Sequence, residues 1–118
     1  MDYYFWTKLY QMKVDNSLKT GDLIRKLRED KELPLRKVAA QLDIDTSFLS
    51  KIERNERKAT KEQIVKLAGI FKVEKNYLMI PYLSEIVAYE IADEDCANQV
   101  LKAVAEEMVK YQKNGKKK

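Results

Sequence analysis

Apolar residues recur at intervals of three or four along most of the sequence, which is the spacing that gives an α-helix one apolar face. The pattern predicts a first helix that opens at Thr20, whose hydroxyl can cap it. Pro34 is tolerated only at the start of a helix, so a second helix should begin there and run to about Leu42. Asp45 is a suitable N-cap for a third helix, which should end near Arg54.

Thr60 and Gln63 have the spacing of a capping box, so a fourth helix should begin after Thr60 and end near Phe71. A short fifth turn is expected at 74–78. Only 3 Gly and 2 Pro occur among 118 residues, and 45% of the residues are hydrophobic, enough for a core. The predicted fold class is therefore all-α, with helices joined by short turns.

Two further helices are expected beyond Pro81. One has the sequence LSEIVAYEIA, and Asp93 can cap a longer one that reaches about Tyr111. The apolar residues of this longer helix recur at spacings of 4, 3, 4 and 3, at Ala97, Leu101, Val104, Met108 and Tyr111. Such a narrow seam is suited to contact with another helix, in the same chain or in a second copy.

Charge is distributed unevenly along the chain, although the net charge is only +4. Residues 16–81 hold 15 basic and 10 acidic side chains, whereas residues 82–112 hold 2 basic and 7 acidic ones. The last six residues, 113–118, add four lysines. This distribution indicates a polyanion-binding part, then an acidic part with another task, then a basic tail.

Four segments follow from these patterns. Residues 1–16 are an aromatic-rich N-terminal extension, which is either peripheral or an arm that packs on a partner or on the domain. Residues 17–80 form the main domain, and residues 81–112 form C-terminal helices for dimerisation or partner binding. Residues 113–118 are the basic tail, which can add non-specific attraction to phosphates.

Residue usage argues against an enzyme. Without histidine there is no Ser-His or Cys-His nucleophile pair, and zinc would lack its commonest nitrogen ligand. No glycine-rich phosphate loop is present, so no cofactor is expected. The single cysteine, Cys96, rules out an internal disulfide and fits a reducing cytoplasm. The lack of any run of about 18 apolar residues predicts no membrane span.

The stretch LPLRKVAAQLDIDTSFLSKIERNER, residues 33–57, joins the second and third predicted helices by a very short turn. The small Ala39 allows the two helices to approach closely, and Ile44 can fill the angle between them. Asp43 can adopt the positive φ that such a turn often needs. The expected result is a steeply crossed helix pair.

From about Leu18 to Leu78 the sequence resembles the helix-turn-helix domain of the phage-repressor and Cro-like family, often called the XRE family. The segment SFLSKIERNER, residues 47–57, carries the most specific part of the likeness. The resemblance implies an all-α, five-helix, lambda-repressor-like DNA-binding domain, to which this chain adds a C-terminal helical extension. It also implies that the third helix enters the major groove of double-stranded DNA, usually as a dimer on a palindrome. In arrangement and length the chain also resembles small regulators found beside restriction-modification genes.

Polar residues of the third helix are candidates for contacts with base edges. These residues are Thr46, Ser47, Ser50 and Lys51. They share the face opposite Leu49 and Ile52. Hydroxyls can donate or accept hydrogen bonds, and Lys51 can donate to O6 and N7 of guanine. A merely polar, solvated face is the alternative interpretation.

Basic residues flank the third helix on both sides. The candidates for phosphate contacts are Arg36, Lys37, Arg54, Arg57, Lys58 and Lys61. Phe48 is open to two interpretations: contact with thymine methyl groups or sugar, or packing in the core or in an interface.

The resemblance also implies a structural ion pair between Arg28 in the first helix and Glu53 in the third. An acid in a helix aimed at phosphates would be repulsive unless it is paired. Two departures from the family pattern affect the site. Leu35 stands where a polar, phosphate-contacting residue is often found. Asn55 replaces the frequent glycine after the third helix, although it can still adopt the left-handed conformation.

The expected function is a cytoplasmic, dimeric, sequence-specific transcriptional regulator that acts by occlusion or by touching RNA polymerase. The alternative is an antitoxin or protein-interaction module whose DNA binding is secondary, with a toxin as its second partner. In both cases the seam between Ala97 and Tyr111 is the expected dimer or partner surface. No cofactor, metal or membrane is expected.

Overall fold

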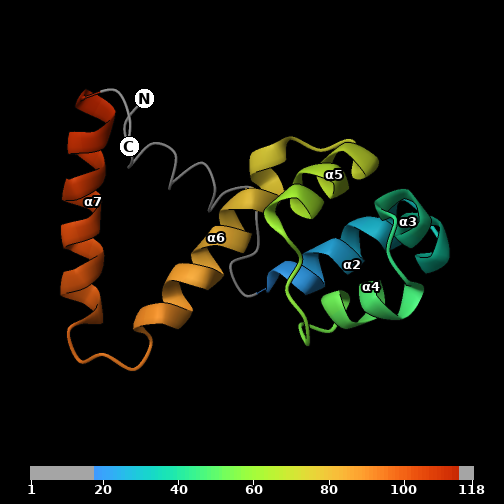
Figure 1. Cartoon of the computed structure of the whole chain (residues 1–118), viewed down its shortest axis with the longest axis horizontal. Helices are drawn as coiled ribbons and strands as arrows, with labels where there is room; N and C mark the ends of the chain where they lie inside the picture. Colours follow the sequence, from blue (N-terminus) through green and yellow to red (C-terminus); the bar gives the residue numbers. More distant parts are fainter. Residues whose placement is uncertain (1–17, 115–118) are drawn as a thin grey trace.

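The computed structural model describes residues 18–114, so the predictions made for residues 1–16 and for most of the basic tail lie outside the described residues. The described part is all-helical, as predicted. Its helices are α2 (Thr20–Asp30), α3 (Leu35–Leu42), α4 (Thr46–Glu53), α5 (Lys61–Phe71), α6 (Lys75–Ile91) and α7 (Ala97–Lys113). Helices α2 to α5 form a bundle, from which α6 leads away to the separate helix α7 (Figure 1).

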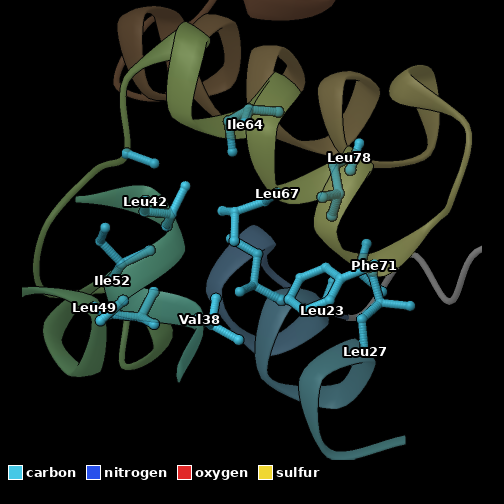
Figure 2. Close-up of a cluster of buried hydrophobic side chains, with 14 of the residues drawn as sticks. Leu23, Leu27, Val38, Leu42, Leu49, Ile52, Ile64, Leu67, Phe71 and Leu78 are labelled. Carbon is cyan, nitrogen blue, oxygen red and sulfur yellow. The ribbon is translucent and has the colours of Figure 1, made fainter. Parts of the chain in front are cut away.

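An apolar core lies among α2, α3, α4, α5 and the start of α6 (Figure 2). Its largest fully buried side chains are Phe71, Ile24, Leu49, Ile64, Leu67, Leu78 and Val38. The apolar spacing in each helix places these side chains on one face, and burial of each large one contributes about 1.5–3 kcal/mol. No residue of α7 is buried, so this helix adds nothing to the core.

Several helix ends lie close to the positions that local signals in the sequence predicted. Thr60 Oγ1 accepts a hydrogen bond from the amide of Gln63 at 3.1 Å, and Gln63 Oε1 accepts one from the amide of Thr60 at 2.8 Å. This is the predicted capping box. Asp43 ends α3 with a φ of 58°, and Asn55 follows α4 with a φ of 63°. Both residues adopt the left-handed conformation expected of them.

The prediction that Thr20 caps the first helix is wrong. Lys19 occupies the N-cap position, and Thr20 is a buried residue of the first turn. The amide of Thr20 donates to the carboxylate of Glu85 at 2.8 Å, and its hydroxyl donates to the same oxygen. A carboxylate from the distant helix α6 therefore accepts from the first backbone amide of α2.

The predicted break at Pro81 is also wrong, because α6 runs through this residue without interruption. A proline inside a helix costs about 3 kcal/mol. Tertiary contacts on both sides of Pro81 offset this cost: Leu78 is buried in the core, and Tyr82 Oη donates to a backbone carbonyl at 2.7 Å. The predicted segment boundary at 80/81 thus falls within a helix. The last helix begins later than predicted, at Ala97 rather than after Asp93.

Substitution of Glu85 by alanine should destabilise the protein by about 1–2 kcal/mol, because the buried Thr20 hydroxyl and amide lose their acceptor. Urea unfolding followed by circular dichroism measures this change. Glu90→Ala is the matched control, since Glu90 lies exposed on the same helix, and it should change stability by at most about 0.5 kcal/mol. Equal stability of the two variants would contradict the capping role of Glu85.

Candidate nucleic-acid interface

The turn between α3 and α4 consists of residues 43–45 and is closed by backbone hydrogen bonds. The amide of Asp43 donates to the carbonyl of Ala40 at 3.1 Å, and the amide of Ile44 donates to the carbonyl of Ala39 at 3.0 Å. Ala39 is buried, and Ile44 packs against the core from the turn. These contacts fix α4 relative to α3, so the outer surface of α4 is held on a rigid helix pair.

Helix α4 has a buried side and an exposed side. The buried side consists of Leu49, Ile52 and Glu53. Ser47 and Lys51 are one helical turn apart on the opposite side and are exposed. Thr46 is exposed as well, whereas Ser50 is half-buried. The structure therefore brings the predicted base-contacting residues together on the outer surface of one short helix.

All the predicted phosphate-contacting residues are exposed. They form two groups, with Arg36 and Lys37 in the first turn of α3, and Arg54, Arg57, Lys58 and Lys61 between the end of α4 and the start of α5. Arg54 pairs with Glu56 at 3.2 Å. Both side chains of this pair are more than half exposed, so water screens the interaction and Arg54 can exchange it for another.

Phe48 packs within the chain. Its side chain is half-buried and contacts the core, and the guanidinium of Arg57 lies 5.1 Å from the centre of its ring. This cation–π contact restrains a long side chain that would otherwise sample many rotamers. Of the two interpretations of Phe48, the structure thus supports packing, with Arg57 held beside α4.

Arg28 and Glu53 are brought together as the resemblance implied. Arg28 Nε and Nη2 donate to the two carboxylate oxygens of Glu53 at 2.7 and 3.1 Å, and Nη1 donates to the carbonyl of Leu33 at 2.9 Å. The hydrogen bond to Glu53 raises the pKa of the Arg28 guanidinium above its ordinary value. Glu53 is only 6% exposed, and the guanidinium neutralises its charge. Helix α4 therefore carries no uncompensated charge from this acid.

A second link joins α2 to the end of α4, and the sequence did not predict it. Asn55 Oδ1 accepts a hydrogen bond from the amide of Gly21 at 3.0 Å, and its Nδ2 donates to Asp22 at 3.3 Å. A Cβ atom at position 21 would lie 2.3 Å from the carbonyl oxygen of Ile52, so the two helices meet through a glycine. The sequence carries only weak signals for this contact, a glycine in the first turn of one helix and an asparagine after another.

Within residues 18–114 no group of three His, Cys, Asp or Glu side chains is arranged to hold a metal ion. None of the helices in that range is long and apolar enough to cross a membrane.

A short polar helix exposed on a helical bundle between two groups of basic side chains is the arrangement that helix-turn-helix DNA-binding domains present to DNA. Residues 24–78 match the family described as Helix-turn-helix, and this segment is a domain of the XRE type. This match supports a DNA-binding transcriptional regulator in the general sense, and the matched family is one of DNA-binding regulators. Comparisons with curated proteins and with solved structures give no match.

Proposed function

We propose that the protein is a cytoplasmic regulator that reads a palindromic operator as a dimer, with α4 in the major groove at each half-site. The observation that carries this proposal is the exposed polar side of α4, which lies between the basic start of α3 and the basic loop before α5. A helix placed in this way can reach base edges while its flanks hold phosphates. Two copies would read half-sites about 34 Å apart, which is one turn of DNA.

The position of each side chain on α4 supports a division of roles. Ser47 and Lys51 point directly away from the core, so we assign them the central base contacts. Thr46 and Ser50 lie toward one edge of the same surface and serve neighbouring bases. The phosphate contacts belong to Arg36, Lys37, Arg54, Arg57, Lys58 and Lys61. A role as a restriction-modification controller is a narrower form of the same proposal.

The second candidate function is an antitoxin or another protein-binding module in which DNA binding is secondary. It is favoured by large apolar side chains that α7 leaves exposed, among them Leu101, Val104 and Met108. Such a surface is typical of a protein contact. Co-purification of a second small protein, such as a toxin, would favour this candidate over the first.

Lys51→Ala should reduce affinity for the cognate operator by about 5- to 150-fold, since a good side-chain contact to a base is worth about 1–3 kcal/mol. The test titrates the protein onto its own upstream DNA and onto scrambled DNA at several salt concentrations. The unmodified protein should prefer upstream DNA by about 10³-fold or more. Binding of Lys51→Ala to scrambled DNA should change little, because that binding depends on phosphates.

Lys102→Ala is the matched control for this titration. It removes the same charge from an exposed position on α7, outside the helix-turn-helix domain. Its affinity for both DNAs should therefore stay within about twofold of the unmodified protein. Equal and weak binding to both DNAs that is indifferent to Lys51 would contradict a regulator that reads this DNA.

A further inference from the structure

The exposed apolar surface of the described residues is concentrated outside the helix-turn-helix domain. Apart from Val65, the large hydrophobic side chains that remain exposed are Leu83, Val87, Tyr89, Leu101, Val104, Met108, Val109 and Tyr111. All of these lie on the second half of α6 or on α7. In proteins most of the stability of a helix comes from packing of its apolar face, and no residue of α7 is buried. Helix α7 therefore needs a partner for its apolar seam.

A hollow of about 600 Å³ lies where α6 meets α7. Leu83, Val87 and Ile91 line it from α6, and Ala97 and Leu101 line it from the start of α7. The hollow continues the seam, since Ala97 and Leu101 belong to both. A partner that covers the seam of α7 would therefore also occupy this apolar hollow beside α6.

Charge distinguishes the two ends of this surface. The turn before α7 carries the exposed acids Asp93, Glu94 and Asp95. The last turn of α7 carries the exposed bases Lys110 and Lys113. Lys110 also pairs with Glu107 at 3.5 Å, but it remains 72% exposed and this pair is weak. One end of the helix is therefore acidic and the other basic, at a separation of about 25 Å.

We infer that a second copy of this chain covers the seam, with the two α7 helices packed antiparallel. This arrangement places the acidic turn of each copy against the basic end of the other, whereas a parallel pair would bring like charges together. The inference rests on the dimer in the proposed function and specifies its interface. The same surface serves both copies, as a two-fold axis requires.

One alignment of the two antiparallel α7 helices both packs the apolar residues of the two seams against each other and places opposite charges side by side. It sets Ala97 opposite the partner's Met108 and Leu101 opposite the partner's Val104, so that larger side chains face smaller ones. Asp95 then lies beside the partner's Lys110. In this register the partner's Met108 and the partner's Tyr111 reach the hollow beside α6, where an adaptable thioether and a large ring can fill an apolar space.

Sedimentation equilibrium tests the surface. The unmodified full chain should be a dimer at micromolar concentration, and Leu101→Glu should weaken dimerisation at least about 100-fold, since two Leu101 side chains leave each interface. Val109→Glu is the matched control, because Val109 is 57% exposed on α7 but lies off the seam, and it should remain a dimer. Neither residue belongs to the core, so both variants should keep the helical content and unfolding midpoint of the bundle.

Disulfide trapping tests the orientation. Ala97→Cys and Met108→Cys are each made in a Cys96→Ser chain, one of them with an affinity tag, and are oxidised separately and as a mixture. Antiparallel pairing should give a mixed disulfide only in the mixture, because positions 97 and 108 face each other across the two chains. Disulfides within either variant alone would indicate a parallel pair and would overturn the inference.

Other outcomes separate this inference from the proposed function. An unmodified chain that stays monomeric at micromolar concentration, with and without DNA, overturns the interface. In that case a shift in Trp6 fluorescence on Leu101→Glu would show that the N-terminal segment covers the seam instead. An antiparallel dimer without preference for any DNA would support the interface while contradicting the reading of DNA by α4. A monomeric protein whose specific DNA binding is lost on Lys51→Ala would support the reading of DNA by α4 while contradicting the interface.

Discussion

Replacement of Arg28 by alanine should lower the free energy of unfolding by about 3–5 kcal/mol and weaken DNA binding at the same time. Arg28 donates two hydrogen bonds to Glu53, which is only 6% exposed. Without Arg28 this carboxylate is left buried and unpaired, and the carbonyl of Leu33 loses a donor. Glu53 is the last residue of α4, so the helix that we propose to read DNA loosens together with the core.

Urea unfolding monitored by circular dichroism gives the stability change, and titration onto operator DNA gives the binding change. Arg25→Ala is the matched control on the same helix. Arg25 pairs with Glu29 at 3.1 Å, but both side chains are more than half exposed, so its loss should cost at most about 0.5 kcal/mol. An Arg28→Ala protein of full stability that fails only in DNA binding would show that Arg28 acts at the DNA instead.

A second variant separates the charge from the packing at this site. Arg28→Leu combined with Glu53→Leu removes both charges and should recover much of the stability that Arg28→Ala loses, because no ion remains buried without a partner. A double variant as unstable as the single one would mean that the hydrogen bond from Arg28 to Leu33 is the larger contribution.

The bundle could be predicted from the sequence because its signals are local. Thr60 and Gln63 are three residues apart, so their capping box depends on nothing outside the first turn of α5. Asp43 similarly needs only its own backbone to adopt a φ of 58°. Where each helix is defined by its own apolar spacing and its own cap, the predicted boundaries lie within a residue or two of the observed ones.

Predictions failed where a distant contact outweighs a local preference. Pro81 indicates a break by local rules, yet α6 continues because the core holds Leu78 before it and a hydrogen bond holds Tyr82 after it. Thr20 has the chemistry of a cap, but Glu85, 65 positions away, binds both its amide and its hydroxyl. No window of neighbouring residues contains either partner.

The candidate site likewise contains one part that could be predicted from the sequence and one part that could not. The outer surface of α4 could be predicted, because the positions of Leu49 and Ile52 determine which residues of that helix face outward. The contact of Gly21 with Asn55 could not, because it joins two helices whose relative placement depends on the whole core. Its two members carry only weak signals, a glycine in one helix and an asparagine after another.

This contact leads to the second large expected effect, which is a loss of about 3 kcal/mol in stability for Gly21→Ala. The added Cβ would lie 2.3 Å from the carbonyl oxygen of Ile52 and 2.5 Å from Asn55 Oδ1. Such overpacking costs about 1–3 kcal/mol and occasionally more. We expect the upper end, because one of these atoms is backbone and can move only if the end of α4 moves with it. The asparagine oxygen also loses its hydrogen bond from the Gly21 amide if α2 is pushed away.

Gly69→Ala is the matched control, and it should have the opposite sign. A Cβ at position 69 meets nothing within 4 Å, and Gly69 lies inside α5, so alanine there should stabilise the protein by about 0.5–1 kcal/mol. Thermal unfolding measures both variants, and DNA titration well below each melting temperature compares their folded states. Gly21 lies on α2, away from the outer surface of α4, so weaker operator binding by folded Gly21→Ala would show that the placement of the end of α4 matters for recognition. A Gly21→Ala protein as stable as Gly69→Ala would mean that α2 and α4 can separate at this point without cost.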